Sequence, residues 1–454
     1  MVLFFHTFMN AFLTNRGSRM NTKLKPIVIA TLAIMVETPA TAAQLKPILI
    51  ESDFRTIQID NTTSSVTAIN QDEIAKKNAQ HLEQILNSTA NVNASAGASR
   101  SRYFQIRGIG ERSQFSTPIN PSVGLFVDGI DYSRTGNAGT LFDVKQVEVL
   151  KGPQGTAFGS SSLAGTINIK SNEANSTPEA KVQTTVGSHN TADLGIVLNG
   201  PLSENVDARI SVYKHTSDGY IKNNYLNKSN TQNQDELTAK ANLKWKASDR
   251  LNFNLNLIAI DINNGYDAFS FDNDFTTTTD QPGDDKLKSA AIALTTNYEV
   301  NDQIDMALTL TNSDSQSLYS YDDDWTYDGQ YSGGYMAKDN YQRDRKNQSF
   351  DLRFLSSQNG KVFNNTTDWV AGVYYINQDE KLNRTYPYVD SSTGKESSRY
   401  QTQNLSTYGQ IDHHLNAKTT LIAGLRIERF NAQYTNSYGF GESTEETLYG
   451  GKLG

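Results

Sequence analysis

The sequence predicts a membrane all-β fold in two parts, a compact N-terminal α/β domain and a long antiparallel transmembrane β-sheet. From about residue 180 onward, apolar and polar residues alternate, as in strands with one apolar and one wet face. Short turns alternate with long polar loops in the same region, and Tyr and Phe recur near the ends of the alternating runs. Both features are typical of outer-membrane barrels. A soluble β-sandwich, which would show the same alternation, is the less favoured alternative.

The first residues predict export. Two lysines precede an apolar run at 27–36, and a tail of small residues ends at Ala43. A basic start, a short apolar run and an Ala-x-Ala end are the parts of a secretory signal peptide. The run is shorter than the roughly 20 residues of a spanning helix, so a membrane anchor is the weaker alternative. We expect a signal peptide over 20–43, with residues 1–19 upstream of the true start and cleavage after Ala42 or Ala43.

The composition argues against several classes of function. The chain has no cysteine, which argues against a disulfide scaffold, a thiolate metal site and a Cys nucleophile. Its net charge of −8, without a basic stripe, disfavours nucleic-acid binding. The histidines are scattered and the carboxylates lie mainly in loops, so no nucleophile and base pair up. We therefore expect that the protein is not an enzyme.

Residues from about 45 to 175 form a compact α/β segment punctuated by glycines. Asn70, with Glu73 three residues later, matches a capping box and predicts the start of a helix. Apolar residues at helical spacing predict a second helix over 79–87. The strand candidates of this segment are 64–70, 103–107, 123–127, 146–150 and 166–169.

Three motifs in this segment carry a resemblance. They are Phe104–Gly110, Pro121–Gly129 and Val147–Gly159, the last continuing through Ala164–Ile169. In this order and spacing they resemble the plug domain of TonB-dependent outer-membrane receptors, and the resemblance extends more loosely through the rest of the chain. A phosphate-binding loop is the alternative for the glycine-rich stretch, but the Gly-Lys-Ser/Thr ending of such loops is absent. The motif residues that we single out are Gly108, Asp128, Gly129, Gly152, Pro153, Gly155 and Gly159.

The resemblance implies a lock between the plug and the barrel wall. In the family, basic residues at the positions of Arg107 and Lys151 commonly face carboxylates on the wall. Lys151 stands where arginine is more usual, and it lacks the two-pronged guanidinium that pairs with a carboxylate. Solvated basic residues are the alternative for both positions.

The resemblance also implies a contact with the periplasmic protein TonB. Family members carry a short extended box near the mature N-terminus, and this box pairs with TonB as an added strand. Ile48, Leu49 and Ile50 resemble this box, although the Thr-Ala pair that usually follows is absent. An ordinary edge strand or a linker is the alternative.

The alternating runs after the plug number eleven, and a twelfth begins near Thr447. A barrel that holds a folded plug needs about 22 strands, so we expect roughly half a wall and a C-terminally truncated chain. The expected domains are a TonB-box and linker region at 44–55, a plug at 56–175 and a barrel segment at 176–454. The expected strands are 180–187, 191–200, 205–216, 235–247, 250–261, 287–300, 303–320, 341–357, 361–379, 401–415 and 418–435, with long loops at 216–234, 261–285, 321–340 and 379–399.

Two groups of residues suggest metal binding. Acidic loop clusters at 272–275, 284–285 and 321–325 offer oxygen ligands for Ca²⁺, but their spacing does not match an EF-hand, and we favour solvated loops. The neighbours His413 and His414 point to opposite faces of a strand and cannot easily share one metal. We therefore predict no resident metal or cofactor.

The resemblance implies an energy-coupled importer in the outer membrane of a Gram-negative bacterium. A small-molecule nutrient, most often a ferric siderophore, would bind the extracellular loops and the plug apex, and TonB would then pull on the plug. The expected partners are TonB, outer-membrane lipid and the nutrient, with no nucleic acid. The alternatives are a receptor for cobalamin, haem or an oligosaccharide, a non-transporting remnant or fragment of a split receptor, and a passive porin.

Overall fold

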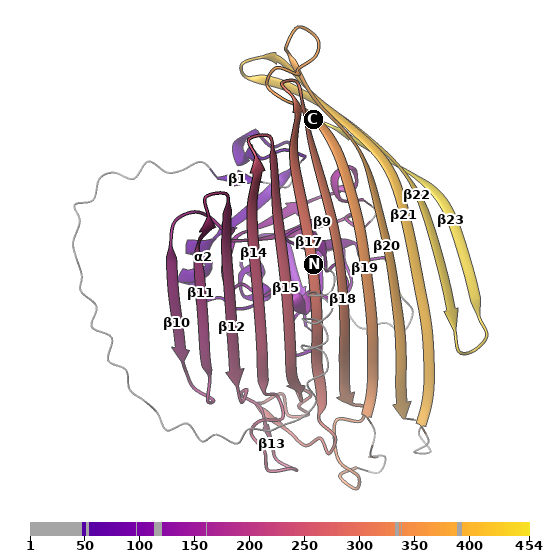
Figure 1. Ribbon diagram of the computed structural model, residues 1–454. Helices are drawn as coiled ribbons and strands as arrows, with labels where there is room; N and C mark the ends of the chain where they lie inside the picture. Colours follow the sequence, from indigo (N-terminus) through magenta and orange to yellow (C-terminus); the bar gives the residue numbers. More distant parts are fainter. Residues whose placement is uncertain are drawn as a thin grey trace. The chain divides into compact units, whose positions relative to one another are not determined.

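The computed structural model describes residues 48–50, 54–96, 98–112, 120–159, 161–331, 336, 338–387 and 393–454 (Figure 1). The chain divides into two units, residues 1–49 and 50–454, and only Ile48 and Leu49 of the first unit are described. The predicted signal peptide at 20–43 lies outside the described residues. None of the helices in the described ranges has the length and apolarity needed to cross a membrane. The fold below is that of the second unit.

The part of this unit that precedes β10, called the plug below, is built on a five-stranded sheet in the order β3-β8-β9-β6-β7. Its neighbouring strands are antiparallel, except that β6 and β9 run parallel. Two further strands, β4 and β5, form a separate antiparallel pair. The bounds are β2 Ile57–Gln58, η1 Ile59–Asn61, β3 Ser65–Asn70, α2 Gln71–Lys76, α3 Leu82–Leu86, β4 Val92–Ser95, β5 Tyr103–Ile106, β6 Val123–Val127, β7 Ile130–Asp131, η2 Gly136–Ala138, β8 Val144–Lys151, α4 Gly155–Phe158 and β9 Gly165–Ser171, with β1 at Leu49–Ile50 before them.

The predicted elements of the plug are largely confirmed. The Asn70 side chain accepts a hydrogen bond from the Glu73 N–H at 3.0 Å, and the Glu73 carboxylate accepts one from the Asn70 N–H at 3.2 Å, which is the predicted capping box of α2. The second helix is shorter than predicted, because the Gln84 side chain caps the N–H groups of Gln80 and His81 before α3 begins. All five predicted strands are present within two residues at each end.

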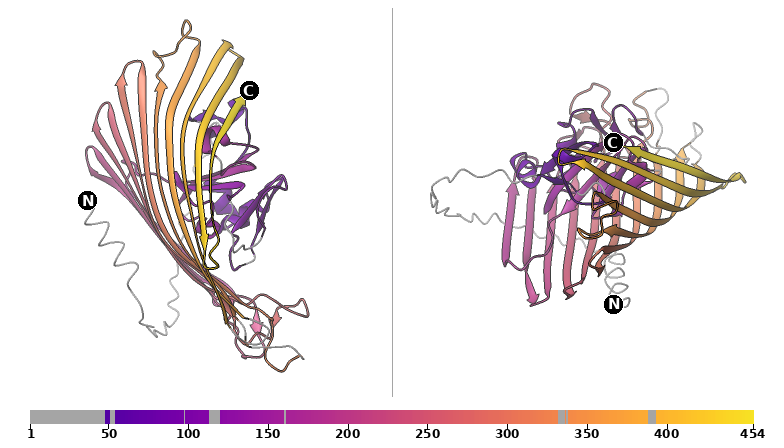
Figure 2. Two further views of the ribbon diagram at one scale, coloured as in Figure 1. Left: turned by 90° about the vertical axis from the view of Figure 1, so that its right-hand side faces the viewer. Right: turned by 90° about the horizontal axis from the view of Figure 1, so that it is seen from above.

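Twelve consecutive antiparallel strands form the wall, and each pairs with its neighbours in the chain (Figure 1). The alternation of the sequence predicted this number and order. Figure 2 shows the plug elements, in indigo and violet, along one face of this sheet. The bounds are β10 Glu179–Val186, β11 Ala192–Ser203, β12 Val206–Ser217, β14 Gln234–Ser248, β15 Leu251–Tyr266, β17 Gly283–Asn301, β18 Ile304–Asp322, β19 Lys338–Ser356, β20 Thr367–Pro387, β21 Thr393–Asn416, β22 Thr419–Asn436 and β23 Gly441–Leu453.

The two faces of the wall differ in polarity. On β11, Leu194, Ile196 and Leu198 are 46%, 39% and 55% exposed, while the opposite face is buried and carries Asp193 and Asn199 beside Val197. A soluble sheet would cover its apolar face and expose its polar one. This reversed arrangement suits an outer face against lipid and an inner face against a polar interior.

The predicted long loops are too long, because the strands continue further than the apolar alternation does. The predicted loop 379–399 is largely strand, since β20 extends to Pro387 and β21 begins at Thr393. The strands remain paired beyond the apolar run, in polar sequence where the alternation disappears. Two short strands, β13 (Lys222–Asn223) and β16 (Thr276–Thr277), also pair in parallel within regions predicted as loops.

Candidate functional site: the interface between plug and wall

Buried ion pairs join the plug to the inner face of the wall. Arg100 of the plug is 1% exposed, and its Nη1 lies 2.8 Å from the Glu236 carboxylate of β14. His81 Nε2 of the plug lies 3.1 Å from the same carboxylate. A buried charge is stable only when it is paired, so Glu236 ties two separate plug segments to one wall strand.

Asp285 of β17 holds the neighbouring plug loop. One of its oxygens accepts hydrogen bonds from the Ser99 N–H at 2.9 Å and the Ser99 hydroxyl at 2.7 Å. The other oxygen pairs with the Arg102 guanidinium. Asp285 is fully buried, and the coulombic attraction and hydrogen bonding of its charge outweigh the effect of burial and raise the pKa of Arg102. Asp285 thus binds backbone N–H groups of the plug as well as its side chains.

A third contact has the opposite polarity. Arg209 of β12 forms a two-pronged ion pair with Asp143 of the plug, with distances of 2.9 Å from Nε and 2.6 Å from Nη2. Burial alone would raise the pKa of Asp143, but the hydrogen bonds and charge of Arg209 hold it below the ordinary value. Lys240 of β14 donates to the Phe142 carbonyl oxygen beside it at 3.2 Å.

Three arginines converge on one carboxylate further along the wall. Glu380 of β20 lies 2.5 Å from Arg345 Nε, 3.5 Å from Arg343 Nε and 3.3 Å from Nη2 of Arg134, which belongs to the plug. Burial lowers the pKa of Arg134, and the charge of Arg345 lowers it further against the opposing effect of Glu380. The Arg134 guanidinium also lies over the Tyr400 ring, 5.6 Å from its centroid. This arginine cluster carries more positive than negative charge.

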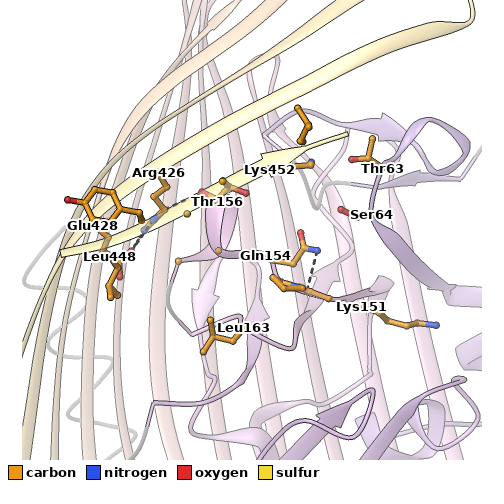
Figure 3. A pocket seen from close by; sticks show the side chains of 18 of the residues that line it. Thr63, Ser64, Lys151, Gln154, Thr156, Leu163, Arg426, Glu428, Leu448 and Lys452 are labelled. Atoms are coloured by element: carbon orange, nitrogen blue, oxygen red, sulfur yellow. Dashed lines mark hydrogen bonds and ion pairs between the residues drawn. The ribbon is translucent and has the colours of Figure 1, made fainter. Parts of the chain in front are cut away.

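A cavity of about 810 Å³ brings together most of the plug residues singled out from the sequence. Its lining includes Arg107, Lys151, Gly152, Pro153, Gly155 and Gly159 from the plug, and Arg426 and Glu428 from β22 (Figure 3). Arg107 lies against Gly152, where an added Cβ would come within 3.2 Å of its Nη1. The two predicted lock residues therefore share one site with the glycine motif.

On the wall side of this cavity, Arg426 and Glu428 face the glycine motif. Arg426 donates to Glu428 at 2.9 Å within its own strand and to the Thr156 carbonyl oxygen of α4 at 3.4 Å (Figure 3). In the view of Figure 3, the Lys151 side chain extends away from this pair. The predicted lock between Arg107, Lys151 and wall carboxylates stays a prediction, since Glu428 is paired with Arg426 instead.

The remaining motif residues form turns. Arg107 and Gly108 have φ values of 54° and 82°, and Asp128 and Gly129 have values of 50° and 84°. Two successive residues with positive φ make the tight hairpin turn that Asp-Gly favours, here between β6 and β7. The Asp128 carboxylate accepts a hydrogen bond from the Ser171 N–H at 2.8 Å, which ties this turn to the end of β9.

The three predicted TonB-contact residues differ in accessibility. Ile48 and Leu49 are 40% and 49% exposed, whereas Ile50 is fully buried. The exposed side chains are accessible to a partner strand. A contact of all three with TonB stays a prediction.

The histidine pair is held by polar neighbours of the wall. His413 Nδ1 lies 2.7 Å from the Thr367 hydroxyl, and His414 Nε2 lies 2.8 Å from the Asp368 carboxylate. No group of three or more metal-ligating side chains is found in the part of the chain that the structure describes.

Sequence reasoning missed the main contacts between plug and wall. Arg100, Arg102, Arg134 and Asp143 lie outside the recognised motifs, and their partners are far away in the chain; Arg100 and Glu236 are 136 residues apart. One signal was available. Charged residues at the inward-facing positions of an alternating strand, such as Glu236 and Lys240 on β14, must be paired with something inside.

Comparisons with known proteins agree with this architecture. Residues 58–166 match the family model described as the TonB-dependent Receptor Plug Domain. The pesticin receptor of Yersinia enterocolitica is 26% identical over 355 residues, which are 73% of this chain and 48% of that protein. The probable TonB-dependent receptor BfrD of Bordetella pertussis is 25% identical over 192 residues, 39% of this chain and 24% of that protein. The chain spans about half the length of the pesticin receptors that it matches.

Solved structures show the same fold. The ferric yersiniabactin uptake receptor FyuA from Yersinia pestis has a TM-score of 0.72 at 19% identity, covering 86% of this chain and 61% of that one. The ferric citrate transporter FecA has a TM-score of 0.67 at 14% identity, covering 86% and 60%. These relatives are receptors and transporters rather than enzymes, in agreement with the sequence prediction. The chain thus carries a TonB-dependent receptor plug domain, docked on the polar face of a twelve-stranded antiparallel wall, and its fold is similar to that of solved TonB-dependent receptors.

Proposed function

We propose that the protein is an outer-membrane receptor that imports ferric siderophore complexes into the periplasm with energy supplied through TonB. The observation that carries this proposal is the plug itself, held on the inner face of the wall by buried ion pairs such as Arg100–Glu236. A plug in this position blocks passive diffusion, so that uptake requires its displacement. This argues for an energised importer over a porin.

The location in the outer membrane is supported by the wall. Its outward side chains on β11 and β22 are apolar and exposed, and Leu425 and Ile427 are 72% and 52% exposed. Exposure of this apolar surface to water is unfavourable. Covering it with lipid contributes about 25 cal/mol of stabilisation for each Å² of apolar area covered. The proposed signal peptide at 20–43 would direct the chain to this membrane, and the proposed domains remain the box and linker at 44–55, the plug at 56–175 and the barrel segment at 176–454.

The nature of the cargo is supported by two observations. Structures similar to this chain include receptors for ferric yersiniabactin, ferric catecholate, ferric preacinetobactin and ferric citrate. The arginine cluster of Arg134, Arg343 and Arg345 provides a surplus of guanidinium groups near the plug. Guanidinium groups bind carboxylates in two-pronged geometry, which suits an anionic ferric chelate.

Uptake of labelled iron tests this function. A bacterial strain that lacks its own siderophore receptors would express the full-length receptor and receive ⁵⁵Fe bound to anionic siderophores. We expect accumulation that depends on TonB and stops when the proton gradient is dissipated. Uptake of cobalamin, haem or an oligosaccharide instead of iron, or accumulation without TonB, would contradict the proposal.

A further inference from the structure

A second cavity lies between the plug and the wall, on the side of the short turns. Its volume is about 500 Å³, within the range of about 300–1,000 Å³ that small-molecule sites occupy. The wall lines it mainly with uncharged polar groups, including Asn254 and Asn256 of β15, Thr295 and Asn297 of β17 and Thr309 of β18, together with Asp351 and Arg353 of β19. The plug contributes further charged side chains, Asp128, Lys145, Lys170 and Glu173. Amides and hydroxyls hydrate a passing solute without holding it as strongly as paired charges do.

The inner face of β15 explains why this space is open. Its inward positions near the long loops are Ile258, Ile260 and Ile262, and these pack into the same apolar cluster as the plug core. Two residues before Ile258, the inward positions change to Asn256 and Asn254. The plug core is therefore seated on the isoleucine half of the strand, and the asparagine half lines the cavity.

Arg55 is anchored at the short-turn end of this cavity. Its guanidinium donates three hydrogen bonds to the wall, at 2.9 Å and 2.8 Å to the carbonyl oxygen and hydroxyl of Ser356 and at 2.8 Å to the Trp369 carbonyl oxygen. Asp368 lies 4.0 Å away and adds an opposite charge. Ser356 ends β19 and Trp369 lies near the start of β20, so Arg55 bridges two wall strands beside their turn.

Phe54 is anchored on the next strand. Its ring stacks on that of Tyr408 with centroids 4.9 Å apart and an angle of 9° between the planes. Tyr408 lies over Gly372, where any added Cβ would come within 2.5 Å of the tyrosine ring. Phe54 is 8% exposed and packs with Val370 in the same small cluster. A glycine in the wall thus makes room for the partner of Phe54.

Phe54 and Arg55 both line the cavity and are adjacent in the chain. They follow Ile50 by four and five residues, so a pull on the predicted TonB-contact segment reaches them before the rest of the plug. The Arg55 side chain is 28% exposed, so water can take the place of its hydrogen bonds to the wall when it moves away. The anchor can therefore open and close repeatedly while the plug core stays folded.

We propose that this cavity is an intermediate binding site on the path of the solute through the receptor, and that it binds a hydrophilic chelate of its own size. Phe54 and Arg55 form the gate that closes the cavity toward the short turns. The inference rests on the proposed function for its cargo. The gate itself is defined by the contacts of two residues with the wall.

Thiol labelling tests the gate without any cargo. The chain contains no cysteine, so Thr295→Cys places a single thiol in it, at the cavity lining. The experiment uses isolated outer-membrane fragments, in which both sides of the membrane are accessible to solvent. The thiol is labelled with a sulfonated maleimide, which does not cross lipid. With Arg55→Ala added, we expect labelling roughly tenfold faster or more, because the loss of even one of its charge-assisted hydrogen bonds shifts an equilibrium by about that factor. Phe54→Ala, which removes the ring stacked on Tyr408, should also speed labelling.

Matched controls separate the gate from general loosening. Arg250→Ala removes an exposed arginine from another short turn, and Phe363→Ala removes an exposed phenylalanine from the β19–β20 turn itself. Both variants should leave the labelling rate unchanged. A thiol at the fully buried plug-core position, Ile167→Cys, should stay unlabelled in the gate variants. If it becomes labelled, Arg55→Lys, which keeps the charge and loses the fork, replaces Arg55→Ala and should give an intermediate rate.

The outcomes distinguish the gate from the cargo. Equal labelling rates with and without Phe54 and Arg55, in receptors whose plug core stays protected, would overturn the gate. A faster rate in the gate variants, together with no iron uptake by the unmodified receptor, would support the gate and refute the cargo assignment. An unchanged rate together with normal iron uptake would do the reverse.

Discussion

Arg209 of the wall grips Asp143 of the plug with two nitrogens, at 2.6 Å and 2.9 Å from its two carboxylate oxygens. Both side chains are nearly buried, with exposures of 6% and 5%. Among the plug–wall contacts, this pair reverses the usual direction, since the wall supplies the cation.

The pair predicts a pH dependence. The pKa of Asp143 is lowered in the folded protein, so its contribution to stability is present above the unfolded pKa of about 3.9 and is lost as pH falls through the lower folded value. Arg209→Ala leaves a buried carboxylate unpaired, and we expect a loss of about 3 kcal/mol near pH 7.

Thermal unfolding of the purified receptor in detergent measures this effect. The difference between Arg209→Ala and the unmodified protein should shrink below about pH 4, because a protonated Asp143 no longer needs the guanidinium. Arg250→Ala, which removes an exposed ion pair with Asp302, should change little at any pH. A difference that does not vary with pH would contradict the assignment.

Two glycines of the same motif predict opposite outcomes. Gly159 has a φ of 77°, and an added Cβ would meet Arg426 Nη2 at 3.0 Å, whereas Gly155 has nothing within 4 Å and no positive φ. We expect Gly159→Ala to lower the free energy of unfolding by about 1–3 kcal/mol through backbone strain. Gly155→Ala, at the first position of α4, should be neutral or slightly stabilising. Thermal melting of both variants decides, and equal melting temperatures would show that the backbone at 159 is not constrained.

The arginine cluster predicts a dependence on cargo charge. Arg345→Gln removes the guanidinium closest to Glu380, and we expect the Kd for an anionic ferric chelate to rise tenfold or more, because a charged hydrogen bond contributes about 1.5–3 kcal/mol. The matched variant Arg399→Gln, an exposed arginine paired with Asp379, should bind normally. Equilibrium binding at two salt concentrations measures this, and unaltered affinity in Arg345→Gln would remove the cluster from the binding site.

The predicted TonB contact can be tested by blocking strand addition. Leu49→Pro removes one backbone N–H from the segment, and an added strand cannot pair fully without it. We expect iron uptake to fall to the level of a TonB-deficient strain while the Kd for the chelate stays the same. Leu49→Ile keeps the backbone donor and should transport normally. Normal uptake by Leu49→Pro would place the contact elsewhere.

The sequence alone predicted the number and order of the wall strands, because a sheet with one apolar face repeats every two residues. The strand ends escaped prediction, since the apolar alternation stops before β20 ends at Pro387 and resumes only after β21 begins at Thr393. The capping box at Asn70 was predictable because its two partners are three residues apart.

The contacts between plug and wall could not be predicted from the sequence, because they join residues that are far apart in the chain. Whether Arg100 meets Glu236 depends on how the plug is turned relative to a sheet that begins many residues later, and no local pattern encodes that angle. The motifs identified Arg107 and Gly152, which line the same cavity. They did not identify the arginines that form the buried ion pairs.

The mixed polarity of these pairs fixes the orientation in which the plug can return after it has moved. Arg100 and Arg102 of the plug meet carboxylates on β14 and β17, whereas Asp143 meets a guanidinium on β12. A plug rotated by one or two strands would set cation against cation and leave anions unmatched in a low-dielectric interior. The charges of these three pairs therefore favour one orientation of the plug on the wall over its rotated alternatives.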